Sequence, residues 1–97
     1  MRDEIRDVFV NGHRLEGGIY TAVEEWCLER TAAKKKYGPI ASWDTSEITN
    51  MDGLFLTKAA FDDDISRWNM SSVESRRYMF LGATSIPLNR RPGGVPY

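Results

Sequence analysis

The chain has 97 residues, 41% of them hydrophobic and 28% charged, and a formal net charge of −1. This length and composition fit one small globular domain and exclude two. The near-neutral charge gives no electrostatic case for binding nucleic acid, and no apolar run is long enough to predict a membrane span. Residues 1–4 are too charged for a signal peptide, which favours an intracellular or organellar location over the cell surface.

Residues 1–18 are predicted to contain a β-hairpin. Asn11-Gly12 stands between two short apolar runs, and this dipeptide favours a type I′ turn because both central residues then have positive φ. His13 is the only histidine and would lie at this turn. Because a single imidazole has no ordered partners here, an exposed turn residue is favoured over a catalytic base or a metal ligand.

Residues 19–37 are predicted to form one amphipathic capping helix. The apolar positions with helical spacing are Ile19, Val23, Trp26 and Cys27. The lysines at 34–36 complement the negative end of a helix dipole, which is favoured over phosphate binding, and Gly38-Pro39 ends the helix. Cys27 is the only cysteine, so no internal disulfide can form, and on the apolar face it is expected to be a buried, inert thiol.

Residues 38–89 are predicted to hold two copies of a repeat, at 40–64 and 65–89. The identical aligned pairs are Ile40/Ile65, Trp43/Trp68, Ser46/Ser71, Phe55/Phe80 and Leu56/Leu81. Since apolar positions that coincide define a shared core, the copies are expected to stack. Short strands are predicted near 40–42, 65–68 and 86–88, and short helices near 51–57 and 76–82. The tetrapeptides Trp-Asp-Thr-Ser and Trp-Asn-Met-Ser are predicted to be turns.

These repeats resemble a known family. The pattern Ile-x-x-Trp-Asp-Thr-Ser-x-Ile-Thr-Asn-Met-x-x-Leu-Phe, continued by Ala-Phe-x-x-Asp-Ile-Ser-x-Trp, is similar to the bacterial surface-protein repeat of the BspA-like, mycoplasma-lipoprotein-type branch of the leucine-rich repeats. The second copy carries it from Trp68 to Thr84, and residues 22–27 with 37–40 are similar to the capping helix of forms from marine microalgae. The resemblance implies partner binding, frequently in adhesion, with no catalytic residues and no cofactor.

The expected fold class is therefore α+β. It is a short leucine-rich-repeat-like solenoid of two repeats, with an N-terminal hairpin and a capping helix. Residues 90–97 contain two prolines and no periodicity, so they are expected to form an extended tail.

Two clusters invite a ligand-binding interpretation. Residues 62–64 are three consecutive aspartates, but a calcium site needs six or more oxygens from alternating positions, so a solvated loop is favoured over a metal site. Trp43 and Trp68 could form a sugar-stacking platform, but their equivalent repeat positions favour packing inside the stack.

The second repeat has no visible cap, and this suggests a function. Its open end should expose apolar surface unless the tail or a partner covers it. We expect a non-catalytic protein–protein interaction module, a structural or accessory subunit docked on a larger assembly, with no nucleic acid partner and no membrane span of its own. An organellar or photosynthetic supercomplex would suit a microalgal source, and self-association through the uncapped end is a further expectation. The expected contact residues are Arg76, Arg77, Phe80, Leu81, Ile86, Leu88, Arg90, Arg91 and Tyr97.

Two alternatives come from other classes of protein. One is an adhesion-type repeat fragment of a larger surface protein. The other, less favoured, is a metal-binding or enzymatic protein that uses His13 or the aspartates at 62–64. For the arginines by themselves, a solvated surface is favoured over a role in binding carboxylates.

Overall fold

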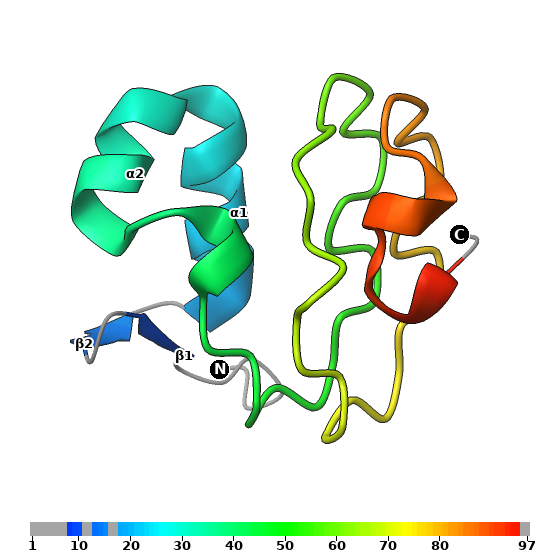
Figure 1. Cartoon of the computed structure of the whole chain (residues 1–97), viewed down its shortest axis with the longest axis horizontal. Coiled ribbons are helices and arrows are strands. Elements are labelled where there is room, and N and C mark those ends of the chain that lie inside the picture. The colour runs from blue at the N-terminus through cyan, green and yellow to red at the C-terminus, as the bar shows by residue number, and fades with distance from the viewer. Residues whose placement is uncertain (1–7, 11–12, 16–17, 96–97) are drawn as a thin grey trace.

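The computed structural model describes residues 8–10, 13–15 and 18–95. Two helices lie on one side of the molecule, and the chain then runs up and down in long loops on the other side (Figure 1). The C-terminal tail lies on the side of these loops that faces away from the helices (Figure 1).

The N-terminal segment forms two short strands. β1 (Val8–Val10) pairs antiparallel with β2 (His13–Leu15), with Phe9 opposite Arg14. The turn predicted at Asn11-Gly12 lies outside the described residues, and the side chain of His13 is likewise not among those described.

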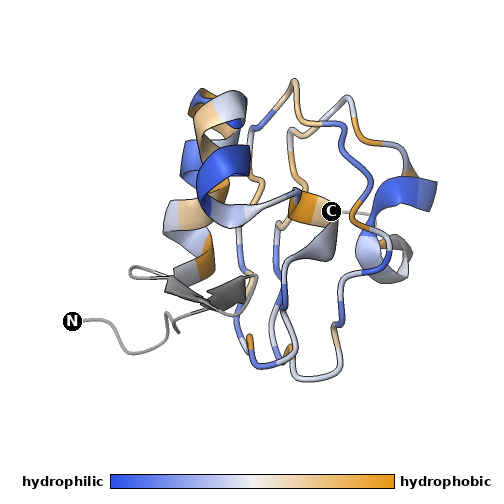
Figure 2. Cartoon of the chain, turned by 60° about the vertical axis from the view of Figure 1, so that its left-hand side comes forward, coloured by the Kyte–Doolittle hydropathy of each residue, from blue (hydrophilic) through white to orange (hydrophobic). Residues whose placement is uncertain are grey.

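The single helix predicted at 19–37 is two helices, α1 (Gly18–Leu28) and α2 (Arg30–Tyr37). Glu29 separates them with φ −142° and ψ 79°, outside the helical region. The break lets α2 lie beside α1, where the Tyr37 hydroxyl donates to the Glu25 carboxylate at 2.8 Å. The sequence pattern predicts a helix that continues through Glu29, but burial of Tyr37 against the domain favours the break. The lysines of α2 form a hydrophilic stretch (blue in Figure 2).

The predicted α+β solenoid is wrong. Within residues 18–95 no strand is assigned, and pairing there is limited to isolated bridges such as the parallel bridge between Asn50 and Ser75. Ile40–Ser42 is a 3₁₀ helix, 65–68 is a turn, 86–88 leads into a 3₁₀ turn, and 51–57 and 76–82 are successive turns. A leucine-rich-repeat architecture built from strands is therefore not the fold of this chain.

The backbone amides explain why these segments are neither strand nor helix. The N–H groups of Met51, Gly53, Phe55 and Thr57 donate to carbonyls 75, 77, 79 and 81 of the second repeat, at 2.7–2.9 Å. The alternating N–H groups of Leu54, Leu56 and Lys58 donate three residues back within the first repeat. Because every second donor is used in a local turn, neither a continuous ladder nor an α-helical series can form.

The core predicted from the coinciding apolar positions is confirmed. The aligned buried pairs are Ile40/Ile65, Trp43/Trp68, Leu54/Met79, Phe55/Phe80 and Phe61/Ile86, each residue at most 4% exposed. The rings of Phe55 and Phe80 stack at 5.3 Å, and those of Trp43 and Trp68 stack at 6.4 Å. The internal packing role predicted for the two tryptophans is therefore also confirmed. Leu56 and Leu81 depart from the pattern, since both are exposed, and Val73 is half-buried although its partner Ile48 is buried.

The two predicted tetrapeptide turns are confirmed. The Asp44 carboxylate accepts from the backbone N–H and the hydroxyl of Ser46, at 3.0 and 2.6 Å. The Asn69 side chain accepts from the Ser71 N–H at the equivalent place in the second repeat. The hydrogen bonds that Ser46 donates lower the pKa of Asp44, the one from its hydroxyl more than the one from its N–H.

Two positions of each repeat have left-handed backbone. Gly53 and Tyr78 occupy one of them, with φ of 63° and 56°, and Thr57 and Gly82 occupy the other, with φ of 59° and 81°. Glycine takes this conformation without a steric cost, whereas a β-branched or bulky residue is strained there. Each repeat thus has glycine at one of its two left-handed positions and a strained non-glycine residue at the other.

The tail is not extended as predicted. It forms 3₁₀ turns at Leu88–Arg90 and Pro92–Gly94, and Val95 is buried. The Arg91 guanidinium lies 4.9 Å over the Phe80 ring and donates to the Ile86 and Val95 carbonyls. The tail therefore covers the aromatic end of the repeat stack.

Candidate functional site

The second repeat leaves a row of backbone donors unused. We call residues 76–82 the open edge. The N–H groups of Arg76, Tyr78, Phe80 and Gly82 are equivalent to the four donors by which the first repeat binds the second, yet they have no acceptor among the described residues. The alternating donors are satisfied, because Met79 and Leu81 donate three residues back and Arg77 donates to the Asp52 carboxylate at 2.7 Å.

The open edge also exposes side chains of the types that dominate protein interfaces. Arg76, Arg77 and Tyr78 are exposed, and so is Leu81. In the part of the chain that the structure describes, neither arginine side chain has a hydrogen-bond or ion-pair partner. Met51, the first-repeat equivalent of Arg76, is fully buried, so the same repeat position has changed from core to surface. Arginine and tyrosine are the residue types most enriched in interface hot spots.

Several of the predicted contact residues are placed differently. Phe80 and Ile86 are each only 2% exposed, so the apolar surface expected at these two residues is buried. The tail covers both residues and caps the second repeat, for which the sequence showed no cap. Arg91 is committed to holding the tail, and Arg90 donates to the Asp62 carbonyl at 2.6 Å.

The remaining predicted contact residues stay available. Arg76, Arg77, Leu81 and Leu88 are exposed, whereas Tyr97 lies outside the described residues. Sequence reasoning missed Tyr78 and the unused amides. Alignment of Tyr78 with Gly53 was the available signal, since it puts an aromatic residue where the other copy has glycine.

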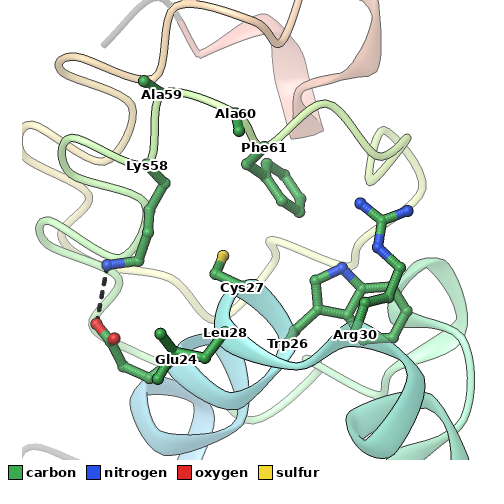
Figure 3. Close-up of a pocket in the computed structure, with 9 residues that line it drawn as sticks. All are labelled: Glu24, Trp26, Cys27, Leu28, Arg30, Lys58, Ala59, Ala60 and Phe61. Atoms are coloured by element: carbon green, nitrogen blue, oxygen red, sulfur yellow. Dashed lines mark hydrogen bonds and ion pairs between the residues drawn. The ribbon is translucent and has the colours of Figure 1, made fainter.

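A hollow of about 350 Å³ lies between the end of α1 and the loop at 58–61 (Figure 3). Its walls are Glu24, Trp26, Cys27, Leu28, Arg30, Lys58, Ala59, Ala60 and Phe61. Lys58 and Glu24 form an ion pair at 2.8 Å on one side (Figure 3). Cys27 is exposed in this hollow, so its predicted burial is wrong. Partial desolvation there raises the pKa of its thiol, which keeps it protonated at neutral pH.

Two of the three aspartates at 62–64 bind separate structural partners. The Asp63 carboxylate accepts from the Trp26 indole at 2.9 Å and pairs with Arg30 at 3.1 Å. The Asp64 carboxylate accepts from the hydroxyl and N–H of Ser66, which lower its pKa. Among the described residues, no three histidine, cysteine or acidic side chains gather in a metal-binding group. The aspartates thus hold α1 and a turn in place.

Comparisons with known proteins define the family. Residues 24–91 match the family described as Mycoplasma protein of unknown function, DUF285. Because the match covers more than half of the chain, the protein belongs to this family. It agrees with the mycoplasma part of the resemblance, but it identifies neither leucine-rich repeats nor a microalgal form. No curated protein and no solved structure matches the chain. In the described part of the chain, no helix is long and apolar enough to cross a membrane.

Proposed function

We propose that the protein is a non-catalytic protein–protein interaction module, a structural or accessory subunit that docks on a larger assembly through the open edge. One observation carries the proposal. Among the described residues, Arg76 and Arg77 have no side-chain partner, and they lie beside exposed Tyr78 on a row of backbone donors that find no acceptor there. Exposed arginine and tyrosine side chains of this kind are enriched in protein interfaces.

The polar residues elsewhere support a non-catalytic role. Asp44, Asp64 and Asn69 hold turns, and Asp63 holds the Trp26 indole. Their carboxylates and amides are therefore occupied by structural hydrogen bonds. The only described thiol, on Cys27, has a raised pKa, which opposes its use as a nucleophile.

Affinity capture with matched charge reversals tests the proposal. The full chain, an Arg76→Glu/Arg77→Glu variant and a Lys34→Glu/Lys35→Glu variant are each used to capture proteins from cells that produce the chain. The lysine variant makes the same change of charge on α2, away from the open edge. We expect one partner that the wild type and the α2 variant retain and the edge variant loses. Equal recovery by all three chains, or no enriched protein, would reject the proposal.

An adhesion-type repeat from a surface protein is the second candidate. The match to a mycoplasma family and the resemblance to surface-protein repeats favour it. It predicts that antibodies to the chain label the outside of intact cells. The docked-subunit hypothesis predicts instead that the chain co-sediments with a larger complex after cell lysis. The organellar or photosynthetic setting is supported by the microalgal resemblance alone.

A further inference from the structure

The first repeat indicates what the open edge requires of a ligand. Met51, Gly53 and Phe55 bind the second repeat by donating their N–H groups to carbonyls at alternate residues, 2.8–2.9 Å away. The open edge offers accessible equivalents of these donors at Arg76, Tyr78 and Gly82, whereas Phe80 is buried beneath the tail. A complementary ligand is thus a polypeptide main chain that presents carbonyls at alternate residues.

A second copy of this chain does not supply that main chain. The matching carbonyls at 75, 77, 79 and 81 already accept from the first repeat of the same molecule. Two open edges brought together would place donors against donors, which leaves both sets unpaired. The pairing of two open edges therefore does not supply the acceptor, and we look for it in a different polypeptide.

Charge selects the kind of polypeptide. Residues 76–91 contain four arginines and no aspartate or glutamate, a formal charge of +4 in a chain of net charge −1. Arg90 and Arg91 are held by backbone carbonyls, whereas Arg76 and Arg77 remain unpaired within the described chain. The planar guanidinium pairs best with carboxylates, so the ligand should carry acidic side chains.

An exposed aromatic ring lies at the same place. Tyr78 is 58% exposed, and the left-handed backbone at φ 56°, which this repeat position shares with Gly53, holds its ring in solvent. An exposed aromatic ring beside two arginines has the composition of an interface hot spot.

We propose that the open edge binds an acidic peptide segment of another protein, with main-chain hydrogen bonds from the exposed amides of Arg76, Tyr78 and Gly82, carboxylate contacts to Arg76 and Arg77, and packing against Tyr78. This inference rests on the proposed interaction function and names the chemistry of its partner.

Amide hydrogen exchange of the full chain, followed by NMR, tests the main-chain contacts. The probe is a short, flexible synthetic peptide of alternating glutamate and alanine, blocked at both ends. Without it, the amides of Arg76, Tyr78 and Gly82 should exchange rapidly, while those of Gly53 and Thr57 are protected. With the peptide in excess, the first three should become at least about tenfold more protected, because they gain acceptors. A lysine–alanine peptide should leave them unchanged. No protection at millimolar peptide, or equal protection by the basic peptide, would overturn the inference.

Two glycine substitutions separate binding from folding. Tyr78→Gly removes the ring and also relieves the left-handed strain, so the unfolding midpoint should stay the same or rise while peptide affinity falls about tenfold. Thr57→Gly relieves the same strain in the first repeat and should change the affinity less than about twofold. Arg76→Gln/Arg77→Gln should weaken binding about three- to tenfold, the effect of two exposed ion pairs. Unchanged peptide affinity in the tyrosine and arginine variants contradicts the inference.

The outcomes also distinguish this inference from the proposed function. If charge reversal at Arg76 and Arg77 abolishes partner capture but the acidic peptide protects no amide, the interaction function stands and the main-chain mode is wrong. If the peptide binds as described but no cellular partner depends on the arginines, the edge chemistry stands and the docking function is wrong.

Discussion

Arg91 should be the most important arginine for stability, although it lies in a segment that looks like a disposable tail. Its guanidinium makes three hydrogen bonds to the Ile86 and Val95 carbonyls and lies 4.9 Å over Phe80. Each hydrogen bond contributes about 1 kcal/mol, and a cation–π contact about 0.5–2 kcal/mol. Because these contributions are not additive, Arg91→Ala should lower the free energy of unfolding by about 2–4 kcal/mol.

Urea and thermal unfolding of the full chain measure this effect. In a domain of this size, each kcal/mol shifts Tm by about 4–8 °C, so Arg91→Ala should lower Tm by at least about 8 °C. Arg91→Lys keeps the charge but loses the paired hydrogen bonds, so its Tm should lie between those of the wild type and Arg91→Ala. Arg90→Ala removes one exposed hydrogen bond and should cost about 0.5–1 kcal/mol. Arg76→Ala should change stability by less than about 0.5 kcal/mol. If Arg91→Ala resembles Arg76→Ala, the tail does not cap the stack.

Three further predictions concern backbone, pH and the thiol. A Cβ on Gly82 would lie 3.1 Å from the Thr57 Cα, whereas on Gly53 it meets only a side chain at 3.8 Å. Gly82→Ala should therefore lower the free energy of unfolding by about 1 kcal/mol more than Gly53→Ala in urea titrations, and equal costs would contradict the close approach. The pKa of Asp44 is lowered by folding, so its charge stabilises the fold above its unfolded pKa, near 3.8, and this contribution is lost as pH falls through the folded pKa. At pH 6 the free energy of unfolding of the wild type should exceed that of Asp44→Asn by a few tenths of a kcal/mol, and this difference should disappear below pH 3. A difference that does not change with pH would mean that the charge of Asp44 does not stabilise the fold. The exposed Cys27 thiol, with its raised pKa, should react with iodoacetamide slowly at pH 7 and much faster above pH 9. Fast alkylation at pH 7 would show that the thiol is activated.

The sequence predicted the parts of the structure that depend on composition at fixed spacing. The repeat alignment located the core pairs, such as Phe55/Phe80, because apolar side chains at equivalent positions are driven into one interior. Local side-chain chemistry predicted the turns at Asp44 and Asn69, because their hydrogen bonds reach only two residues along the chain.

Only part of the candidate site could be predicted from the sequence. The arginines Arg76 and Arg77 were identifiable, because Arg76 breaks the apolar pattern of the first repeat. Phe80 and Ile86 were placed on the surface by mistake, since their burial depends on where the tail folds. Tyr78 was missed because tyrosine itself does not indicate a left-handed backbone, and only its alignment with Gly53 signals one.

By itself, then, the sequence determined the repeat, its core positions, its side-chain turns and the arginine pair, all of which follow from residue type and spacing. Only the tertiary structure decided three further features. Glu29 breaks the predicted helix so that Tyr37 can be buried, and Arg91 turns an irregular tail into a cap. The repeats form turns where strands and helices were predicted, because alternate amides donate to carbonyls about 24 residues away in the chain. A local sequence pattern does not indicate such distant hydrogen bonds. The same alternation leaves the amides of the open edge unpaired.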